Sequence, residues 1–562
     1  MSTYPLDCIL VGYNDVNLQA VVNSTELMAK VSGALRNMLH NTVSFHGKRM
    51  NYTTLLNTIL TEATGKDYDL HVMQLPNLGV AYLKSFLIRN GLNVEAVNFF
   101  NREKEWLATL VEGGARVVVI TTTFYVGPEP IIEIIKYVRR IRPETIIIVG
   151  GPHIFNVCND QDIATQNYYF KKLGADILIY ESQGEAALTR VLHELRKGRN
   201  QDLSQIPNLI YKKETQTGGI KQSGDALLSV SGAKLSERFI RTPKETENNS
   251  LDENMIDWSL FQQSYYTPTV QMRTARSCAF KCAFCSYPVM AGPLSLMSLE
   301  VIEREMSQLK ENGVKSIIFI DDTFNVPLAR YKKILKMMIR NKFEFNWVSY
   351  FRCSNSDEES FDLMAESGCR GVFLGIESGD DEMLLKMNKL AAVEKYESGI
   401  NSLNARGIIT FVSLIVGFPG ETRKSVEVTM DFITRTCPTF YRAELYYHSN
   451  HLPIQKQATQ YGIRGGGYSW QHDTMDWQKA CDLIDLMYKS INSSIILPEY
   501  MFDFWSIPYL LGKGIKKEHI IEFAKLSQSL LVDGLDNSVT INVEDLHHRL
   551  GLLSRRIIED LE

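Results

Sequence analysis

The chain has 562 residues and a formal net charge of -5, and 44% of its residues are hydrophobic and 22% are charged. These values are typical of an ordinary soluble globular protein and imply no basic surface for nucleic acid. A chain of this length is expected to hold about three or four domains with sizeable cores.

The N-terminus and the cysteine content both favour a cytoplasmic protein. The start of the chain, 1–7, lacks the basic-then-apolar layout of a signal peptide. No charge-free apolar run reaches the ~18 residues of a membrane span. Nine cysteines, three of them clustered, suggest a reducing interior rather than a disulfide scaffold. We therefore predict a soluble cytoplasmic protein that binds neither membrane nor nucleic acid.

Residues 1–205 are predicted to form an α/β domain with a Rossmann-like, doubly wound parallel sheet. The segment 6–12 reads as a buried strand, and 17–65 reads as a helical insertion. From residue 69 onward, apolar strands alternate with amphipathic helices, which is typical of a parallel sheet covered on both faces. These later strands are predicted at 94–99, 116–121, 145–150 and 176–180.

Such a sheet binds its ligand at the C-terminal ends of the strands. Glycines there allow close approach of the backbone, and hydroxyls and helix N-termini offer donors to amide or phosphate oxygens. The candidate ligand-binding residues at these strand ends are Thr121, Thr122, Thr123, Gly150, Gly151, Pro152, His153, Glu181, Gly184 and Glu185.

Residues 206–267 are predicted to be a connector with a short strand pair at 208–213 and 227–231, and Asp257–Phe261 is expected to dock it onto the next domain. Residues 268–448 repeat strand and helix six times, which predicts a partial (β/α)6 barrel with its chemistry at the strand C-termini. Residues 449–562 are predicted to be a mostly helical domain that caps the substrate. The barrel strands are expected near 268–275, 316–320, 346–351, 371–376, 409–416 and 440–446.

Three cysteines follow the first predicted barrel strand in a C-x3-C-x2-C spacing, at Cys278, Cys282 and Cys285. Three thiolates on a tight loop can hold three irons of a [4Fe-4S] cluster and leave the fourth iron open for a small molecule. The alternatives are a zinc knuckle and simple buried thiols. Zinc usually takes four protein ligands, however, and no C-x2-C partner follows downstream.

The cysteine loop resembles that of the radical S-adenosylmethionine (SAM) enzymes. The resemblance implies that SAM chelates the open iron through its amino and carboxylate groups, and that its other contacts come from successive strand ends. At the fifth strand the match is imperfect, because Ser413 replaces an expected glycine and Glu421 falls one place late. The residues that match SAM contacts are Phe284, Asp321, Asp322, Arg352, Glu377, Ser378, Ile415 and Gly417.

The upstream sheet is similar to the cobalamin-binding domains of B12-dependent radical SAM enzymes. The similarity covers about 70–200, with an L-P-x-L-G-x-x-Y-L opening at 75–83 and G-G-P-H at 150–153. It implies that the strand-end residues bind cobalamin, together with Pro76 and Asn77 of the opening motif. The D-x-H-x-x-G motif is incomplete around His71, so we expect no histidine on the lower face of cobalt. The alternative is a Rossmann-like domain with only a structural role.

Together the resemblances imply a class B, cobalamin-dependent radical SAM methyltransferase. In that family the reduced cluster splits SAM to a 5′-deoxyadenosyl radical, which takes hydrogen from an unactivated substrate atom. Methylcobalamin then delivers the methyl group, and a second SAM remethylates the cobalt. The family's electron donor would be a reductant such as flavodoxin or ferredoxin.

Two stretches narrow the expected substrate to a small molecule or peptide in natural-product biosynthesis. The run 291–294 and the loop 468–476 resemble a branch that contains a phosphinate P-methyltransferase and a tryptophan methylase. A carbon or a phosphinate phosphorus centre is therefore the expected methyl acceptor. The candidate substrate contacts, for each of which simple packing is the alternative, are Tyr446, Tyr447, His448, Tyr468 and Trp470.

Three rival interpretations stay open at this point. The first keeps both cofactors but performs a rearrangement or a cyclisation without methyl transfer. In the second the N-terminal domain is a partner-binding module without corrin, and the third is a non-catalytic zinc protein.

Overall fold

A computed structural model describes residues 6–14, 31–125, 127–198, 201–212, 239–261, 265, 268–498, 504–535 and 542–562. The chain forms two compact units and passes between them three times. The first unit contains Met1–Val16 and Pro76–Phe261, and the second contains Asn17–Leu75 and Gln262–Glu562. In the described part of the chain, no helix combines the length and apolarity needed to cross a membrane.

A seven-stranded sheet organises the first unit. In spatial order its strands are β4 (Val94–Phe99), β1 (Cys8–Tyr13), β5 (Val117–Thr121), β6 (Ile146–Gly150), β7 (Ile177–Ile179), β8 (Leu209–Lys212) and β9 (Phe239–Arg241). The first five are parallel, and β8 and β9 are antiparallel additions. The parallel strands follow the doubly wound order 2-1-3-4-5, which places a ligand crevice where the order reverses, at the C-terminal ends of β1 and β5.

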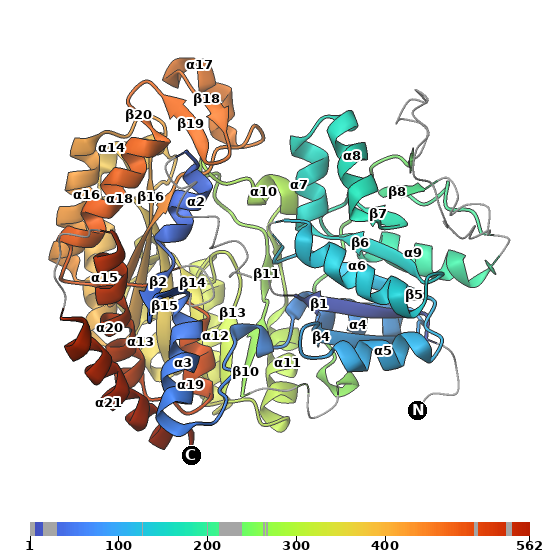
Figure 1. Cartoon of the computed structure of the whole chain (residues 1–562), viewed down its shortest axis with the longest axis horizontal. Helices are drawn as coiled ribbons and strands as arrows, with labels where there is room; N and C mark the ends of the chain where they lie inside the picture. Colours follow the sequence, from blue (N-terminus) through green and yellow to red (C-terminus); the bar gives the residue numbers. More distant parts are fainter. Residues whose placement is uncertain are drawn as a thin grey trace. The chain divides into compact units, whose positions relative to one another are not determined.

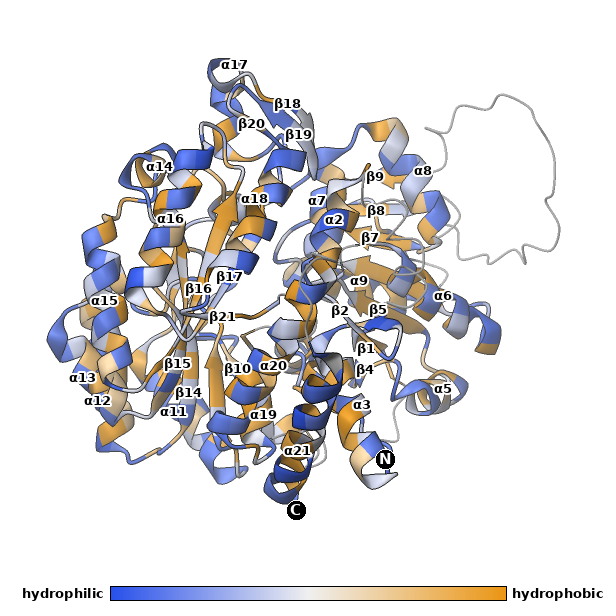
Figure 2. Cartoon of the chain, turned by 60° about the vertical axis from the view of Figure 1, so that its left-hand side comes forward, coloured by the Kyte–Doolittle hydropathy of each residue, from blue (hydrophilic) through white to orange (hydrophobic). Residues whose placement is uncertain are grey.

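Helices cover both faces of this sheet, as predicted. They are α4 (Leu78–Arg89), α5 (Lys104–Glu112), α6 (Glu129–Ile141), α7 (Pro152–Asp160), α8 (Ile163–Leu173) and α9 (Glu185–Arg196). Apolar side chains of α5 to α8 pack into one core, and those of α4 and α9 pack into the core on the other face. The hydropathy colouring in Figure 2 shows this pattern as apolar strands beneath helices with polar outer faces.

The connector packs on the first unit rather than on the barrel. Trp258 is fully buried, the Asp257 amide donates to Ser85 Oγ at 3.0 Å, and Lys84 Nζ lies 5.2 Å from the centre of the Phe261 ring. The prediction that this segment docks onto the following domain is therefore wrong, because its partners lie on α4. The predicted strand at 227–231 lies outside the described residues.

A second seven-stranded sheet, entirely parallel, forms the partial barrel (Figure 1). Its strands are β10 (Thr269–Met272), β13 (Ser316–Phe319), β14 (Asn346–Phe351), β15 (Cys369–Glu377), β16 (Ile409–Val416), β17 (Phe440–Leu445) and β21 (Ile495–Ile496). The first six confirm the predicted strands. The two-residue β21 was not predicted, because a pair of isoleucines is too short to give a periodic signal.

The outer helices of the barrel alternate with its strands. They are α11 (Leu299–Glu311), α12 (Leu328–Arg340), α13 (Glu358–Glu366), α14 (Asp381–Lys386), α15 (Val393–Ala405), α16 (Arg423–Thr436) and α18 (Trp477–Ser490). Strand order follows chain order, and β10 and β21, the outermost strands, are not paired within the described residues. The fold is therefore the open, partial barrel that the sequence predicts.

The strand register stacks the barrel interior in layers. Tyr350, Phe373, Phe411 and Phe440 are partners across four adjacent strands, and the Phe504 ring packs 5.8 Å from Phe373. The next interior row, two residues further along each strand, holds Gly375, Ser413 and Arg442. The aromatic layer closes the interior, so the open space for chemistry lies at the strand C-termini.

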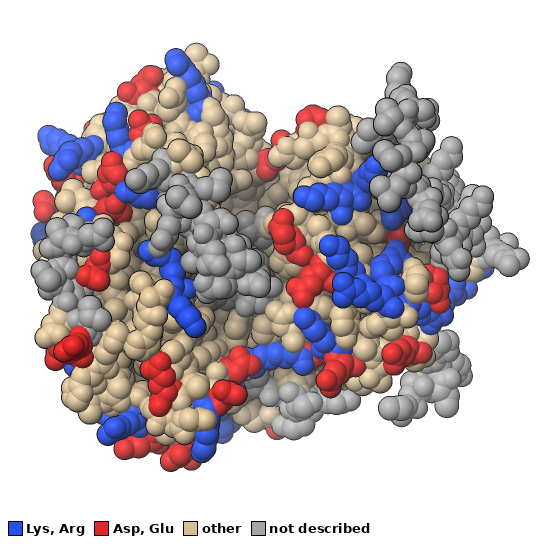
Figure 3. All heavy atoms as spheres, viewed as in Figure 1, with Lys and Arg blue, Asp and Glu red and all other residues tan. Residues whose placement is uncertain are grey.

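The segment predicted as an insertion in the sheet domain belongs to the second unit. Its helices are α2 (Gly33–Leu39) and α3 (Tyr52–Thr64), and α3 packs against α20 (Lys517–Leu535) and α21 (Val543–Leu561). Arg36 of α2 bonds Asp485 of α18 at 2.6 Å. These contacts hold the segment Asn17–Leu75 against the C-terminal helices within the second unit. Over the face seen in Figure 3, basic and acidic side chains are interspersed among the described residues.

Candidate functional site

The cysteine loop runs between β11 (Ala275–Arg276) and α10 (Tyr287–Ala291), at the C-terminal end of the first barrel strand. Two other segments hold its backbone. The Ala283 amide donates to Met387 O at 2.8 Å, and the Ile454 amide donates to Ala283 O at 3.0 Å. The loop is therefore clamped between the residues after α14 and a segment of the C-terminal region.

The three thiols on this loop differ in burial. Cys282 is buried, while Cys278 and Cys285 are half-buried, and Cys278 Sγ lies 3.5 Å from Thr323 Oγ1. Burial raises the pKa of Cys282, and the nearby Lys389 opposes that shift. Burial also raises the pKa of Cys285 to about 11. Both thiols are thus protonated near neutral pH, and a metal that binds them must displace those protons.

Among the residues that the structure describes, no group of three or more His, Cys, Asp or Glu side chains is placed to hold one metal ion. Three ligands that each bind a different iron of a cubane stand further apart than three ligands of a single ion.

The two acids at the end of β13 have different surroundings. Asp321 is buried and accepts from the Thr274 amide at 2.6 Å, from the Ala275 amide at 2.9 Å and from Thr274 Oγ1. Its oxygens hold the start of the cysteine loop. Asp322 has an exposed side chain. Of the pair, Asp322 is the acid that can meet a ligand.

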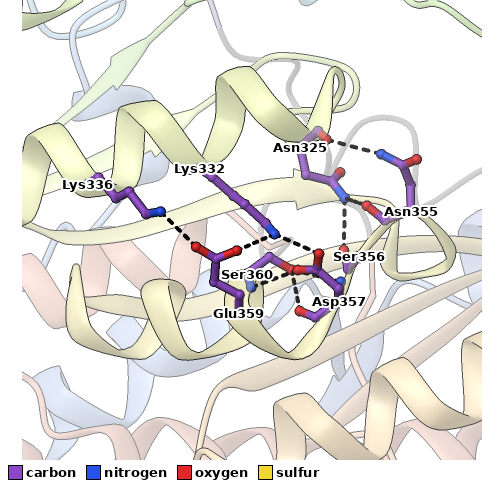
Figure 4. Close-up of polar contacts among 8 residues, drawn as sticks. All are labelled: Asn325, Lys332, Lys336, Asn355, Ser356, Asp357, Glu359 and Ser360. Atoms are coloured by element: carbon purple, nitrogen blue, oxygen red, sulfur yellow. Dashed lines mark hydrogen bonds and ion pairs between the residues drawn. The ribbon is translucent and has the colours of Figure 1, made fainter.

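Arg352 follows β14 and is held in place by Asn325. Asn325 Oδ1 accepts from the Arg352 amide at 3.0 Å, and Asn325 Nδ2 donates to Arg352 O at 2.9 Å and to Asn355 O at 3.1 Å. Figure 4 shows Asn325 beside Asn355 and Ser356, with Asp357 capping the next helix. The Arg352 guanidinium lies 3.7 Å from the centre of the Phe280 ring, and its Nη2 is buried with no hydrogen-bond partner among the described residues. This donor suits a bound carboxylate.

The end of β15 carries a buried ion pair. Glu377 Oε1 accepts from Lys389 Nζ at 2.9 Å, with the side chains only 10% and 8% exposed. Lys389 Nζ also lies 5.3 Å from the centre of the Phe284 ring, so this cation links the cysteine loop to the fourth strand. Ser378 is fully buried and bonds Thr429 of α16 at 3.2 Å. Glu377 therefore lies near the cysteine loop, whereas Ser378 is directed to the packing of the barrel.

The turn after β16 is closed by Trp470. A Cβ atom at Gly417 would lie 2.3 Å from Trp470 Cη2, and the φ of Gly417 is +96°, so only glycine fits there. Glu421 is buried and accepts from the Gly417 amide. Ile415, one of the predicted SAM contacts, lies two residues before Gly417 and is half-buried.

Burial raises the pKa of Glu421 to about 8, so in the folded protein this side chain is mostly protonated at neutral pH. Because the folded state then binds the extra proton, stability is expected to fall as pH rises from about 4.5 to about 8. Glu421→Gln mimics the protonated form. It should leave stability unchanged at pH 5 and raise it by ~1–3 kcal/mol at pH 8.5, measured by thermal unfolding across pH. Parallel pH curves for variant and wild type would contradict this. Glu427→Gln on the exposed face of α16 is the control.

The predicted substrate residues divide into two groups. Trp470 Nε1 donates to Tyr446 O at 2.6 Å, and the Tyr446 hydroxyl bonds His448 Nδ1 at 3.0 Å, all three side chains being buried. This group forms a packed network. Tyr447 is 52% exposed, and its ring lies 5.0 Å from that of Tyr468. These two rings are the members of the set that a ligand can reach.

In the first unit, the three threonines at the end of β5 point in different directions. Thr121 Oγ1 donates to Val11 O at 3.2 Å, and Thr122 Oγ1 donates to Gly150 O at 2.9 Å. Thr123 is exposed. The first two hydroxyls therefore join neighbouring strands, and only Thr123 presents its side chain at the strand ends.

The Gly-Gly-Pro-His run begins a helix that the sequence did not predict. Pro152 is the first residue of α7, and Gly151 precedes it with φ +112°. A Cβ at Gly151 would lie 2.9 Å from Thr122 Oγ1 and 3.1 Å from Thr122 N, so the ends of β5 and β6 pack too closely there for any residue but glycine. The helix N-terminus adds donors at the same edge. His153 bonds the Tyr169 hydroxyl, and burial lowers the pKa of His153.

At the end of β7, the predicted ligand-binding residues bond mostly to other groups of the protein. Burial raises the pKa of Glu181, which accepts from Ser182 Oγ at 3.2 Å. Gly184 has φ +68° and precedes α9. Glu185 Oε2 accepts from Asn249 Nδ2 at 2.9 Å. The amides in the first turn of α9 also have a partner, because Glu247 accepts from Ala186 N and Ala187 N at 2.8 Å each.

At the crevice itself the structure adds a residue that we did not predict. Asn14 follows β1 and is buried. Its Nδ2 donates to Pro130 O at 2.8 Å, while its Oδ1 has no partner in the part of the chain that the structure describes. The sequence signal that could have identified Asn14 is a polar residue directly after an apolar strand. Pro76 and Asn77 are also buried there, and Asn77 caps α4 by accepting from Val80 N at 3.1 Å. His71 belongs to the other unit and accepts from Met73 N at 3.1 Å.

Comparison with known proteins matches both parts of this architecture. Residues 272–433 match the radical SAM superfamily, and residues 72–161 match the B12 binding domain. An uncharacterized methyltransferase of Pyrococcus horikoshii is 24% identical over 461 residues, which are 79% of this chain and 91% of that protein.

Two solved structures share the fold. The radical SAM methyltransferase TsrM from Kitasatospora setae, with cobalamin and a [4Fe-4S] cluster bound, aligns over 99% of both chains with a TM-score of 0.58 and 16% identity. The cobalamin-dependent SAM radical enzyme OxsB, with aqua-cobalamin bound, covers 91% of this chain and 90% of its own, with a TM-score of 0.54 and 14% identity. The chain therefore pairs a B12-binding domain with a radical SAM domain, and its fold is that of TsrM and OxsB.

Proposed function

We propose that the protein is a cobalamin-dependent radical SAM methyltransferase that acts on an unactivated carbon or a phosphinate phosphorus of a small molecule or peptide in natural-product biosynthesis. The observation that carries the proposal is the meeting of the three-cysteine loop, the Lys389–Glu377 pair and the unpartnered Arg352 Nη2 at the barrel strand ends. When bound, the cluster and cobalamin would supply the electron and the methyl group respectively.

The barrel residues divide the binding of SAM among them. Cys278, Cys282 and Cys285 would hold the cluster, and Arg352 would donate to the SAM carboxylate. Asp322 would accept from the SAM ammonium, since Asp321 is engaged with the cysteine loop. Glu377 would accept from the ribose hydroxyls on the side away from Lys389.

In the first unit, residues at the ends of β1, β5 and β6 would hold the corrin. Asn14 Oδ1 can accept from a corrin amide, and Thr123 and the N-terminus of α7 can donate to corrin oxygens. The Gly150–Gly151 backbone would lie against the ring. Tyr447 and Tyr468 would line the path of the substrate.

Isotope transfer tests the reaction class. With SAM labelled in its methyl carbon, anaerobically reconstituted enzyme should pass the label to product and consume two SAM molecules per turnover. If product forms without label, the methyl-transfer proposal is wrong and the rearrangement or cyclisation alternative is favoured.

Gly151→Ala is expected to weaken the binding of hydroxocobalamin by roughly tenfold or more, because the added methyl would clash with Thr122 and shift the strand ends that are proposed to hold the corrin. Spectrophotometric titration measures the dissociation constant. Gly91→Ala is the matched control, since Gly91 also has positive φ but a methyl group added there would meet nothing within 4 Å. Equal affinities for both variants would remove the glycine pair from the corrin site.

A further inference from the structure

Two buried polar groups of the barrel have no hydrogen-bond partner among the residues that the structure describes. One is Nη2 of Arg352, a residue that is only 8% exposed, and the other is the hydroxyl of Tyr396 on α15, which is 1% exposed. A buried tyrosine hydroxyl usually finds a partner, and a buried donor that lacks one costs free energy. Each of these two donors therefore calls for an acceptor.

The helix that carries Tyr396 packs on the segment that follows Arg352. A Cβ atom at Gly399 would lie 2.5 Å from Cβ and 3.1 Å from Sγ of Cys353, so α15 and this segment are in direct contact. Tyr396 precedes Gly399 by three residues, which places it on the same face of the helix. Because Cys353 directly follows Arg352 in the chain, this face of α15 is held against the end of β14.

Electrostatics place the Tyr396 hydroxyl among the groups of the candidate SAM site. Burial raises the pKa of Tyr396, and the guanidinium of Arg352 opposes that shift. Cys353, Glu377 and Cys282 each raise the pKa further. Interactions of this kind weaken with distance, so the hydroxyl lies near the guanidinium and on the side of the barrel that carries the cysteine loop.

The acceptor that suits both donors is a carboxylate supplied by a ligand. A guanidinium and a hydroxyl that donate to one group favour an anion with two oxygens. The other contacts of Arg352 are a donation from Nε to Ser354 Oγ at 3.3 Å and the stacking on Phe280, neither of which uses Nη2. Glu377, the nearby carboxylate of the protein, accepts from Lys389 Nζ at 2.9 Å and from neither donor.

We propose that the Tyr396 hydroxyl is a second donor to the carboxylate of SAM, beside Nη2 of Arg352. The proposal rests on the proposed function, which places that carboxylate at Arg352. Both donors are shielded from water, so a hydrogen bond that they make to an ion is stronger than the same bond at a surface. Helix α15 would thereby take part in SAM binding, although the sequence led us to expect contacts from strand ends alone.

Tyr396→Phe tests the assignment, because it removes the hydroxyl and keeps the ring. The affinity of the full-length, cluster-loaded protein for SAM, measured by calorimetry, should fall roughly tenfold or more, since a bond to a charged group is lost. The affinity for 5′-methylthioadenosine, which has the adenine and the ribose but no carboxylate, should stay at the wild-type value. In urea, the SAM-free variant should be no less stable than the wild type, because the hydroxyl has no bond to a described residue that could be lost.

Tyr331→Phe on α12 is the matched control. The Tyr331 hydroxyl is also buried without a partner in the described part of the chain, so this variant should change neither affinity and should not lower stability. Unchanged SAM affinity in the Tyr396 variant would overturn the proposal. Equal losses for both ligands, or a lower stability of the SAM-free variant, would show a packing role and would overturn it as well. Failure of the wild type to bind SAM would instead overturn the proposed function, and the assignment of Tyr396 with it.

Discussion

Cys282→Ala is expected to abolish SAM cleavage and the iron–sulfur absorbance while leaving hydroxocobalamin binding unchanged. The loop should keep its shape, because its anchoring bonds run through the Ala283 backbone rather than through the thiol. Substitution of residues that hydrogen-bond to metal ligands typically lowers metal affinity or activity about 10- to 100-fold, so loss of a ligand itself should have a larger effect. Corrin binding should persist because its predicted residues belong to the other unit.

The measurements are iron content, the visible spectrum and 5′-deoxyadenosine formation under anaerobic reducing conditions. Cys481→Ala on α18 is the control, since that thiol is buried and distant in sequence from the loop. If SAM cleavage persists in the Cys282 variant, the assignment of the three ligands is wrong. Stoichiometric zinc in the wild type would point to the structural zinc alternative.

Glu377→Ala is expected to destabilise the second unit by about 3–5 kcal/mol, because it leaves the Lys389 ammonium buried without its anion. The full-length protein should show this as a lower free energy of unfolding in urea. SAM affinity should fall as well, since Glu377 lies beside the cysteine loop through the contact of Lys389 with Phe284.

The double variant Glu377→Gln/Lys389→Met separates the two effects. Removing both charges should restore most of the stability, because no unpaired ion remains buried. SAM affinity should stay low if the carboxylate contacts the ribose. Recovery of both properties would show that Glu377 serves only to neutralise Lys389.

Periodicity predicted the fold closely because each strand is either a continuous apolar run or a clear alternation between amphipathic helices. The strand Ile146–Gly150 is an example, since it lies within the strand predicted at 145–150. Helix α7 escaped because Gly151 and Pro152 read as a turn, although proline is also favoured in the first turn of a helix. Pairing of distant segments, such as α3 with α21, leaves no local signal.

The sequence predicted which strand ends carry the candidate site, but it did not predict how the side chains there are arranged. Spacing placed the aspartates at the end of β13, yet only the hydrogen bonds show that Asp321 faces Thr274 while Asp322 stays exposed. Glu377 was predicted without its partner Lys389, because twelve residues separate them in the chain. Trp470 looks like a substrate contact in sequence but fills the space over Gly417.

The threading of the chain between the units has a consequence for synthesis on the ribosome. Strand β1 emerges first but pairs with β4 and β5, which are translated about 90 to 110 residues later. Helix α3 must wait longer still, since α20 and α21 are the last helices made. A gene fragment that begins at residue 262 would therefore encode a barrel whose terminal helices lack their packing partner α3. To express the two units separately, a circularly permuted gene should be used rather than a truncation at residue 262.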